Sequence, residues 1–485
     1  MQETSQAFKD LMESNVRPKC EPVIIVSGID NEGNETTLVW EAKNIKSMNY
    51  KWGIDPIGRN FPFMELTWTE IYKGKLGPEA YPEKYKNIVK YMEVELSFKQ
   101  NLGFFNTWKN VLSKYITWKS IKDNGKTWKE IKNDIIFEKI TFPKMFLSAR
   151  PVIEGQTITW TANDVLSFLE DKQVKPFCND SPIPFSNPVA YLLLYQRGSF
   201  LESNKIFESL TDSVNSLDYF NDLGHDPKPL TKNILFDSST KDALKNYLCL
   251  ENKHLSFEDN ILVVKDLNQY YESYDENKVY RFTEKLLFEH PKITNGTNIS
   301  SYVFKSYLLH IDKDNPYSID PSETVEFYGA SFYKYNFNGY GTPFEDRIEN
   351  ISYAYSNPNQ PSTHYQLTVF PVNYDSYDNV IKNEGATGEA YIEDNPVNPF
   401  GKDSEYAKDR FNFLKNYFSS NSSSIEFSGL PNISIEPGDI VEVETNLSSD
   451  GEKIIKNALL ISLEITYNGL IKEKYIAHEV LVNDN

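Results

Sequence analysis

Cysteine is scarce in this sequence, with three residues in 485. Cys20, Cys178 and Cys249 are too far apart for a CxxC metal site and too few for a disulfide framework. Scattered thiols of this kind are typical of a protein made in a reducing compartment. The sequence therefore does not predict a disulfide-stabilised secreted domain.

Long apolar runs are also lacking. The longest, at residues 190–195 and 458–463, are far shorter than the roughly 18 residues that a membrane-spanning helix requires. The first 15 residues carry several charges, and their apolar side chains recur on one helical face. This pattern predicts a short amphipathic helix instead of a signal peptide. We expect a chain that does not insert into a membrane.

Catalytic signatures are missing as well. The sequence has no phosphate-binding loop, no dinucleotide-binding glycine motif, no HExxH zinc motif and no GxSxG nucleophile motif. Its six histidines lie far apart, which does not favour a shared metal. Acidic residues from Asp312 to Glu323 have the spacing of a calcium loop, but Tyr317 stands where that loop requires glycine. We predict no catalytic, cofactor-binding or metal-binding residues, no cofactor and no enzymatic activity.

The charge is strongly negative and unevenly distributed. The formal net charge is -19, with 22 basic against 19 acidic residues in positions 1–145 and 28 against 50 in the rest. An acidic chain repels a phosphate backbone, so direct nucleic-acid recognition is not expected. Aromatic residues make up 14% of the chain. Such a content is more typical of β-rich interaction proteins than of helical enzymes.

Alternating patterns predict strands along most of the chain. Residues 23–27 and 36–40 flank an Asn- and Gly-rich turn and predict a hairpin, and residues 63–72 and 89–98 alternate as half-buried strands do. We expect an α+β fold that is predominantly β, with small β-barrels and short helices. The predicted divisions are residues 1–160 (a β-rich domain), 161–270 (an α+β domain with a linker), 271–400 (a Tyr-rich β domain or insertion) and 401–485 (a helix with a β-barrel-like module).

A Thr-Trp-Lys triplet occurs three times at a spacing of ten, with its tryptophans at Trp108, Trp118 and Trp128. An aliphatic residue follows each tryptophan by three positions and would share one face of a helical turn with it. The favoured interpretation is three short turns that bury tryptophan in a common groove. The alternative is a ladder that stacks on carbohydrate.

Tyrosine is concentrated in residues 325–345. Tyrosine is enriched at subunit interfaces because it adds contact area at little entropic cost, which favours an interface here. A platform for sugar rings is the alternative.

Three motifs follow one another in the C-terminal region: a helical run at residues 405–417, the Glu436-Pro437-Gly438-Asp439 turn before an apolar strand, and the Tyr467-Asn468-Gly469 turn. In this combination they resemble the closing module of phage tail-tip and baseplate hub proteins. Residues 160–169, and a helix at 240–250 followed by a polar hairpin at 254–266, are similar to elements of that family in the same order. The Trp triplets are similar to repeats in tail proteins of phages with Gram-positive hosts.

This resemblance implies a structural virion protein of the tail, assembled in the cytoplasm of the bacterial host. It implies a ring, commonly a trimer, that joins the tail tube to the tip or spike and that contacts the tube, tip and tape-measure proteins. A receptor- or glycan-binding tail protein is the first alternative, and a tail-associated wall hydrolase is the second.

Overall fold

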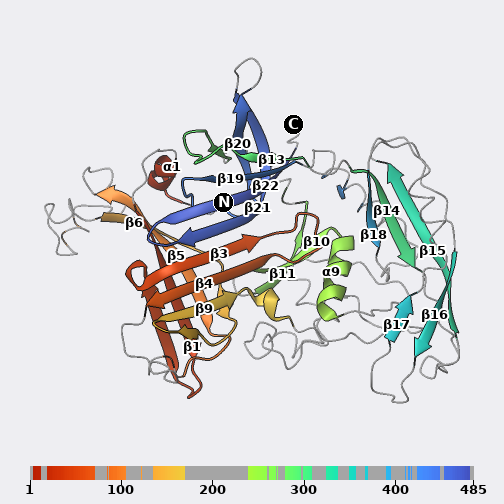
Figure 1. Cartoon of the computed structure of the whole chain (residues 1–485), viewed down its shortest axis with the longest axis horizontal. Helices are drawn as coiled ribbons and strands as arrows, with labels where there is room; N and C mark the ends of the chain where they lie inside the picture. Colours follow the sequence, from red (N-terminus) through yellow and green to blue (C-terminus); the bar gives the residue numbers. More distant parts are fainter. Residues whose placement is uncertain are drawn as a thin grey trace.

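The computed structural model describes residues 4–12, 19–71, 85, 87–104, 119, 122, 135–169, 239–258, 261–268, 270, 279–295, 299–307, 324–336, 349–356, 366–369, 389–394, 410, 413–414, 417, 423–447 and 453–480. The largest structural element in this part of the chain is one 15-stranded sheet (Figure 1). Its strands are β1 (Cys20–Ile29), β2 (Glu35–Glu41), β3 (Ile45–Gly53), β4 (Phe63–Ile71), β5 (Glu93–Phe104), β6 (Ile135–Thr141), β7 (Met145–Leu147), β8 (Val152–Glu154), β9 (Thr157–Asn163), β12 (Tyr280–Phe282), β13 (Lys292–Thr294), β19 (Ser424–Gly429), β20 (Ile440–Leu447), β21 (Lys453–Tyr467) and β22 (Ile471–Glu479).

The N-terminal part of this sheet folds over on itself. Its strands follow the order β3-β4-β9-β7-β5-β1-β2, so β2 is remote from β4 and β9 in the hydrogen-bonded path. The ring of Trp40 on β2 nevertheless lies 5.5 Å from that of Trp68 on β4 and 5.0 Å from that of Trp160 on β9. The inner faces of the two halves therefore enclose one core. Within the described strands, the order of hydrogen-bonded neighbours runs from β13 at one end to β2 at the other. The sheet is therefore curled but not closed.

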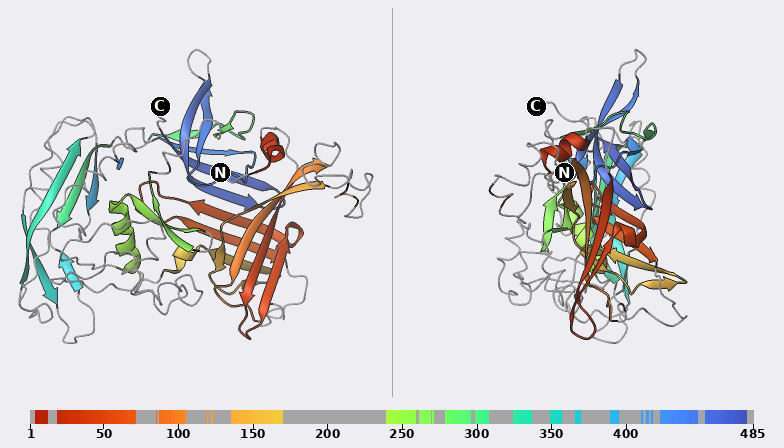
Figure 2. Two further views of the ribbon diagram at one scale, coloured as in Figure 1. Left: turned by 180° about the vertical axis from the view of Figure 1, so that it is seen from behind. Right: turned by 90° about the vertical axis from the view of Figure 1, so that its left-hand side faces the viewer.

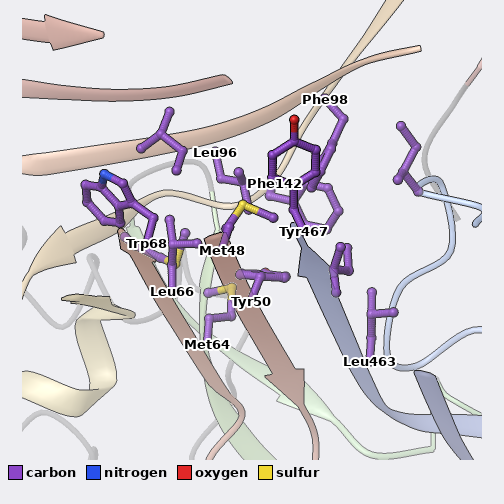
Figure 3. Close-up of a cluster of buried hydrophobic side chains, with 14 of the residues drawn as sticks. Met48, Tyr50, Met64, Leu66, Trp68, Leu96, Phe98, Phe142, Leu463 and Tyr467 are labelled. Atoms are coloured by element: carbon purple, nitrogen blue, oxygen red, sulfur yellow. The ribbon is translucent and has the colours of Figure 1, made fainter. Parts of the chain in front are cut away.

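Alternation along the strands fills this core. In β4, Met64, Leu66 and Trp68 are buried, while the residues between them lie on the outer face. A period of two is the pattern of a sheet with one covered face. Figure 3 shows these side chains beside Met48 and Tyr50 of the neighbouring strand β3. The hydrophobic pattern thus sets the register, because a shift by one residue would exchange the two faces.

The long strand β21 joins the N-terminal and C-terminal parts of the sheet. On one edge its first half pairs with β20 and its second half pairs with β3, while its other edge pairs with β22. The aromatic residues Phe282, Phe427 and Tyr475 pack under this C-terminal part with ring centroids 4.8–5.1 Å apart. These rings belong to the same buried cluster as the N-terminal core, so β21 connects two parts of one core that are remote in the sequence.

Short elements surround this sheet. Helix α1 (Gln6–Met12) buries Phe8 and Met12, and helix α9 (Thr240–Leu250) precedes a hairpin of β10 (Lys253–Glu258) and β11 (Ile261–Asp266). Two 3-10 helices, η1 (Ala42–Asn44) and η3 (Val165–Phe168), follow β2 and β9. In Figure 2 the hairpin and α9 lie between the large sheet and a second, smaller sheet.

The second sheet has five strands in the order β17-β16-β15-β14-β18. Its strands are β14 (Ile299–Tyr307), β15 (Thr324–Asn336), β16 (Glu349–Ser356), β17 (Gln366–Val369) and β18 (Glu389–Asp394). Pairing is antiparallel except between β14 and β18, which are parallel. The predicted Tyr-rich segment contributes the central strand β15.

The predominantly β class is confirmed, and so are the hairpin of β1 and β2 and the hairpin of β10 and β11. Capping propensity predicts a helix that starts at Thr161 or Asn163 before the apolar residues 165–169, and a second helix capped by Thr240. Both predicted helix starts were wrong. Thr161 and Asn163 lie in β9, and the side chain of Asp164 caps η3 instead. Ser239, and not Thr240, caps α9 by accepting from the backbone of Asp242 at 3.2 Å. At both sites, neighbouring residues have short polar side chains that can cap a helix. Capping propensity alone therefore could not identify which of them is the cap.

Candidate functional site

The turn at residues 436–439 is the sequence motif with the clearest structural outcome. Gly438 has a φ of 101°, which side-chain-bearing residues rarely adopt. The Asp439 carboxylate accepts a hydrogen bond from the Glu436 backbone at 2.8 Å, and the Asp439 backbone donates to the Glu436 carbonyl at 3.0 Å. The turn is therefore closed by its own residues, as expected from the Pro-Gly-Asp sequence.

This turn is hydrogen-bonded to β21 at the point where the strand paired with β21 changes from β20 to β3. The Gly438 N–H donates to the Leu460 carbonyl at 2.8 Å, and the Leu460 N–H donates to the Asp439 carbonyl at 2.9 Å. β21 is bulged at the next position, where the Ile461 carbonyl accepts from the Ile54 N–H at 2.9 Å. The bulge thus lets one strand bind the C-terminal turn and the end of β3 at the same point.

Tyr270 packs on the other side of the turn. A Cβ atom at Gly438 would lie 2.8 Å from the Tyr270 ring, so the ring occupies the space that a side chain would need. The Tyr270 hydroxyl is 2.8 Å from Nε2 of His254, a residue of β10. Burial lowers the pKa of His254 to about 4, so this imidazole is neutral at pH 7. The hairpin is thereby connected to the C-terminal turn through one tyrosine.

A cleft of about 580 Å³ opens beside this contact. It lies between the ends of β3 and β4, the segment after β6, the hairpin and the 436–439 turn. Three kinds of side chain line it: aromatic rings and prolines, carboxylates, and two lysines. The main ones are Trp52, Phe142, Tyr270, Pro62, Pro143, Pro437, Glu95, Asp164, Glu436, Lys144 and Lys265.

Asp164 forms one wall of the cleft and has a structural role. Its carboxylate accepts from the Met64 N–H at 2.6 Å and from the Ser167 N–H at 2.8 Å. The side chain therefore extends the pairing of β4 with β9 and caps η3. Burial raises the pKa of Asp164, while these hydrogen bonds act in the opposite direction.

Arg410 connects its own segment to two others near the hairpin. It is fully buried, and its guanidinium donates to the Asn252 side chain at 3.1 Å, to the Ile57 carbonyl at 2.7 Å and to Sγ of Cys249 at 2.9 Å. Asn252 itself has a φ of 56° at the end of α9. The guanidinium therefore connects the loop after β3, the end of α9 and the segment before β19.

We call the place where the 436–439 turn, the bulge in β21, the hairpin and Tyr270 meet the junction. Its residues had little sequence signal. His254 is one of six isolated histidines, and Tyr270 belongs to no motif. Asp164 and Arg410 lie in the segments 160–169 and 405–417 that resemble the family, but nothing in the sequence identifies their partners. Each acts through a contact with a residue far away in the chain, which periodicity does not reveal. The three tryptophans of the repeat and the acidic stretch at 312–323 lie outside the described residues.

Within the described residues no group of three or more His, Cys, Asp or Glu side chains is arranged to bind a metal ion. The same part of the chain contains no helix that is long and apolar enough to span a bilayer.

The sequence matches no family model and no curated protein. Several solved structures are similar in backbone. The 43-kDa tail protein of prophage MuSo2 from Shewanella oneidensis has 10% identity and a TM-score of 0.42, over 94% of this chain and 98% of its own. A tail protein from Neisseria meningitidis MC58 has 9% identity and a TM-score of 0.40, over 95% and 96%.

The c3393 protein of E. coli, a component of the type VI secretion system, has 7% identity and a TM-score of 0.34, over 90% of this chain and 74% of its own. Because all three TM-scores are below 0.5, the proposal that follows rests on the residues of this chain.

Proposed function

We propose that the chain is a structural component of a bacteriophage tail tip or baseplate. The observation that carries the proposal is the local structure of the C-terminal motif. Gly438 adopts a positive φ, the turn closes through Asp439, and strand β20 begins at Ile440 directly after it. Val441 and Val443 are buried on one face of that strand. These are the features that the sequence resemblance implies for these residues.

The connection through β21 suits such a role. A tail component must hold its neighbours in fixed positions while force passes through the particle. Here the last strands of the chain are hydrogen-bonded to β3 along six residue pairs, from Ser462–Gly53 to Tyr467–Met48. Separating the two parts would require breaking a row of backbone hydrogen bonds, each of which is costly to leave unmade in a buried sheet.

In this proposal the chain forms a ring, a trimer, that joins the tail tube to the tip or spike and contacts the tape-measure protein. It is assembled in the cytoplasm of a Gram-positive-type host and remains in the virion tail. The large number of aromatic residues supports assembly, since rings of this kind supply much of the area of subunit interfaces.

Electron microscopy of labelled particles tests the proposal. A gold label on a tag that follows Asn485 should lie at the tip of the tail in every intact particle. A stop codon early in the gene should give particles with no tip or baseplate, or no tails. A label on the head, or normal infectious tails without the protein, would refute the proposal.

A further inference from the structure

The cleft of about 580 Å³ beside the 436–439 turn has no role in the proposed function. Its walls come from segments that are remote in the sequence: β3 and β4, β5 with the segment after β6, η3 with the residue before it, the hairpin and the turn. Its volume is within the range of pockets that bind small ligands. The cleft is therefore a candidate ligand site, and the chemistry of its lining indicates the class of ligand.

Trp52 lies where the core opens into the cleft. It follows Met48 and Tyr50 at alternate positions of β3, and those two residues are buried while Trp52 is half-buried. Its ring packs against that of Phe142 with centroids 6.3 Å apart. The structure shows no hydrogen bond from the Trp52 indole N–H to any described residue. Because such an N–H usually has a partner when it is covered, Trp52 offers a ligand both a ring and a donor.

The charges of the cleft are largely balanced within the protein. Glu95 forms an ion pair with Lys139 at 2.7 Å, and Lys144 forms one with Glu93 at 3.0 Å. The Asp164 carboxylate accepts from two backbone N–H groups. The remaining charged groups of the lining are one carboxylate and one ammonium group, which are of opposite sign. A neutral ligand is therefore favoured over an anion or a cation, because a charged ligand would be desolvated without a free counter-charge.

A neutral sugar has the properties that this lining requires. It carries no charge, its hydroxyls both donate and accept hydrogen bonds, and its C–H face can pack on an aromatic ring. Trp52, Phe142 and Tyr270 supply rings to the cleft. The hydroxyl of Ser256, on the hairpin, also lines the cleft and has no hydrogen bond to any described residue. A wholly apolar ligand is disfavoured because it would cover these polar groups without pairing them.

An extended peptide is also neutral and also combines polar with apolar groups. Peptides commonly bind by adding a strand to a free sheet edge. β3 is paired with β21 and β4, and β4 is paired with β3 and β9, so neither of these bordering strands offers a free edge. A proline-rich peptide, which binds between aromatic rings without adding a strand, is distinguished from a sugar by the experiment below.

We propose that the cleft binds a neutral saccharide of one or two sugar rings. One ring packs on the Trp52 indole, and a hydroxyl of the sugar accepts a hydrogen bond from the indole N–H. A second hydroxyl pairs with that of Ser256, so the ligand contacts both the large sheet and the hairpin. This inference goes beyond the proposed tail role and does not depend on it.

Isothermal titration calorimetry of the purified full-length protein tests the proposal, with maltose, cellobiose, lactose and N,N′-diacetylchitobiose as probes. At least one of them should bind with a Kd in the millimolar range or below, whereas glucose 6-phosphate, an anion, should not bind. Trp52→Ala should weaken binding by about 10-fold or more. Trp52→Phe keeps a ring but removes the N–H and should weaken binding by about 3-fold. Phe63→Ala is the matched control, because Phe63 is an exposed ring of β4 outside the cleft, and it should bind like the wild type.

Two changes on the hairpin test the cleft without altering the large sheet. Ser256→Trp fills the cleft and should abolish binding. Ser256→Ala removes one hydroxyl and should weaken binding by about 3-fold. Circular dichroism shows whether each variant is folded. If Trp52→Ala is unfolded, Ser256→Trp decides the result.

The proposal would be overturned if none of the four sugars binds, if a folded Trp52→Ala or Ser256→Trp protein binds as tightly as the wild type, or if Phe63→Ala loses as much affinity as Trp52→Ala. Tighter binding of a decaproline peptide than of any of the sugars would also overturn it and would assign the cleft to a peptide. None of these results depends on where the protein lies in a particle, so the proposed tail location would stand or fall separately.

Discussion

The core of the N-terminal sheet and the junction at the C-terminal turn are held together in different ways. In the core, Trp40, Trp68 and Trp160 contact one another with ring centroids 5.0–5.7 Å apart, and all three are buried. At the junction the contacts are mostly hydrogen bonds to backbone groups, beside an open cleft. The first arrangement derives its stability from apolar area, and the second derives its geometry from directed bonds.

The core also encloses one carboxylate. Glu70 accepts from the indole N–H of Trp40 at 2.9 Å and from that of Trp160 at 3.3 Å. A buried polar group is tolerated when it is hydrogen-bonded, and here it also fixes the positions of two rings. This comparison shows that the core tolerates few changes, whereas the junction is a place where a small change alters how segments are connected.

The largest effect is expected at the centre of the core. Trp160→Ala removes a ring that contacts three other aromatic side chains, including Tyr85 at 5.0 Å, and leaves a cavity. The free energy of unfolding should fall by about 3–5 kcal/mol, as measured by urea denaturation. Trp52→Ala is the control, because Trp52 is half-buried at the cleft and should cost clearly less. Equal losses would contradict the distinction between core and junction.

The next effect is a pH dependence at the junction. The pKa of His254 in the folded state is about 4, below its ordinary value of 6.5, because burial disfavours the charged ring. The unfolded chain therefore binds this proton first, and stability is lost as the pH falls from 6.5 to 4. Groups around the ring include Lys265, its register partner on β11, and Tyr270.

His254→Gln should abolish this part of the acid sensitivity. Relative to pH 7, the wild type should lose about 3 kcal/mol more than the variant by pH 4, since one pKa unit corresponds to about 1.4 kcal/mol. Urea denaturation at a series of pH values measures the difference. Parallel curves for the two proteins would show that His254 is not buried as described.

A smaller effect is expected from the turn. Gly438→Val places a β-branched residue at a φ of 101° and should cost about 1–3 kcal/mol from backbone strain. Gly469 has a φ of 102° with no atom within 4 Å of a Cβ, so Gly469→Val carries the strain without a clash. The excess loss in Gly438→Val therefore measures displacement of Tyr270. If thermal melts show the same loss for both variants, Tyr270 does not pack on the turn.

Much of this fold follows from local patterns. The alternation in β4, the turn before β20 and the hairpin of β10 and β11 were predictable because each depends on residues within about ten positions. The 436–439 turn in particular is specified by proline, glycine and aspartate in the order that such a turn requires.

The junction was not predictable in the same way. That β21 pairs with β3 depends on residues more than 400 positions apart, such as Ile465 and Tyr50. Arg410 contacts Asn252 and Ile57, and Tyr270 packs on Gly438, all more than 100 positions away. An isolated Arg or Tyr carries no sign of such a partner. Only the assembled sheet brings the turn, the hairpin and the bulge in β21 to one place.

The smallest predicted effect lies one residue away from the largest. Thr159 precedes Trp160 in β9 and lies on the opposite, outer face, where its hydroxyl is 3.2 Å from that of Thr69 on β4. Thr159→Val keeps the branched shape that strands favour and removes one partly exposed hydrogen bond, so the cost should be about 0.5 kcal/mol or less. Urea denaturation beside Trp160→Ala gives the contrast directly. Because a one-residue shift in register exchanges the two faces of a strand, a large loss at Thr159 with a small loss at Trp160 would show that β9 is paired in a different register.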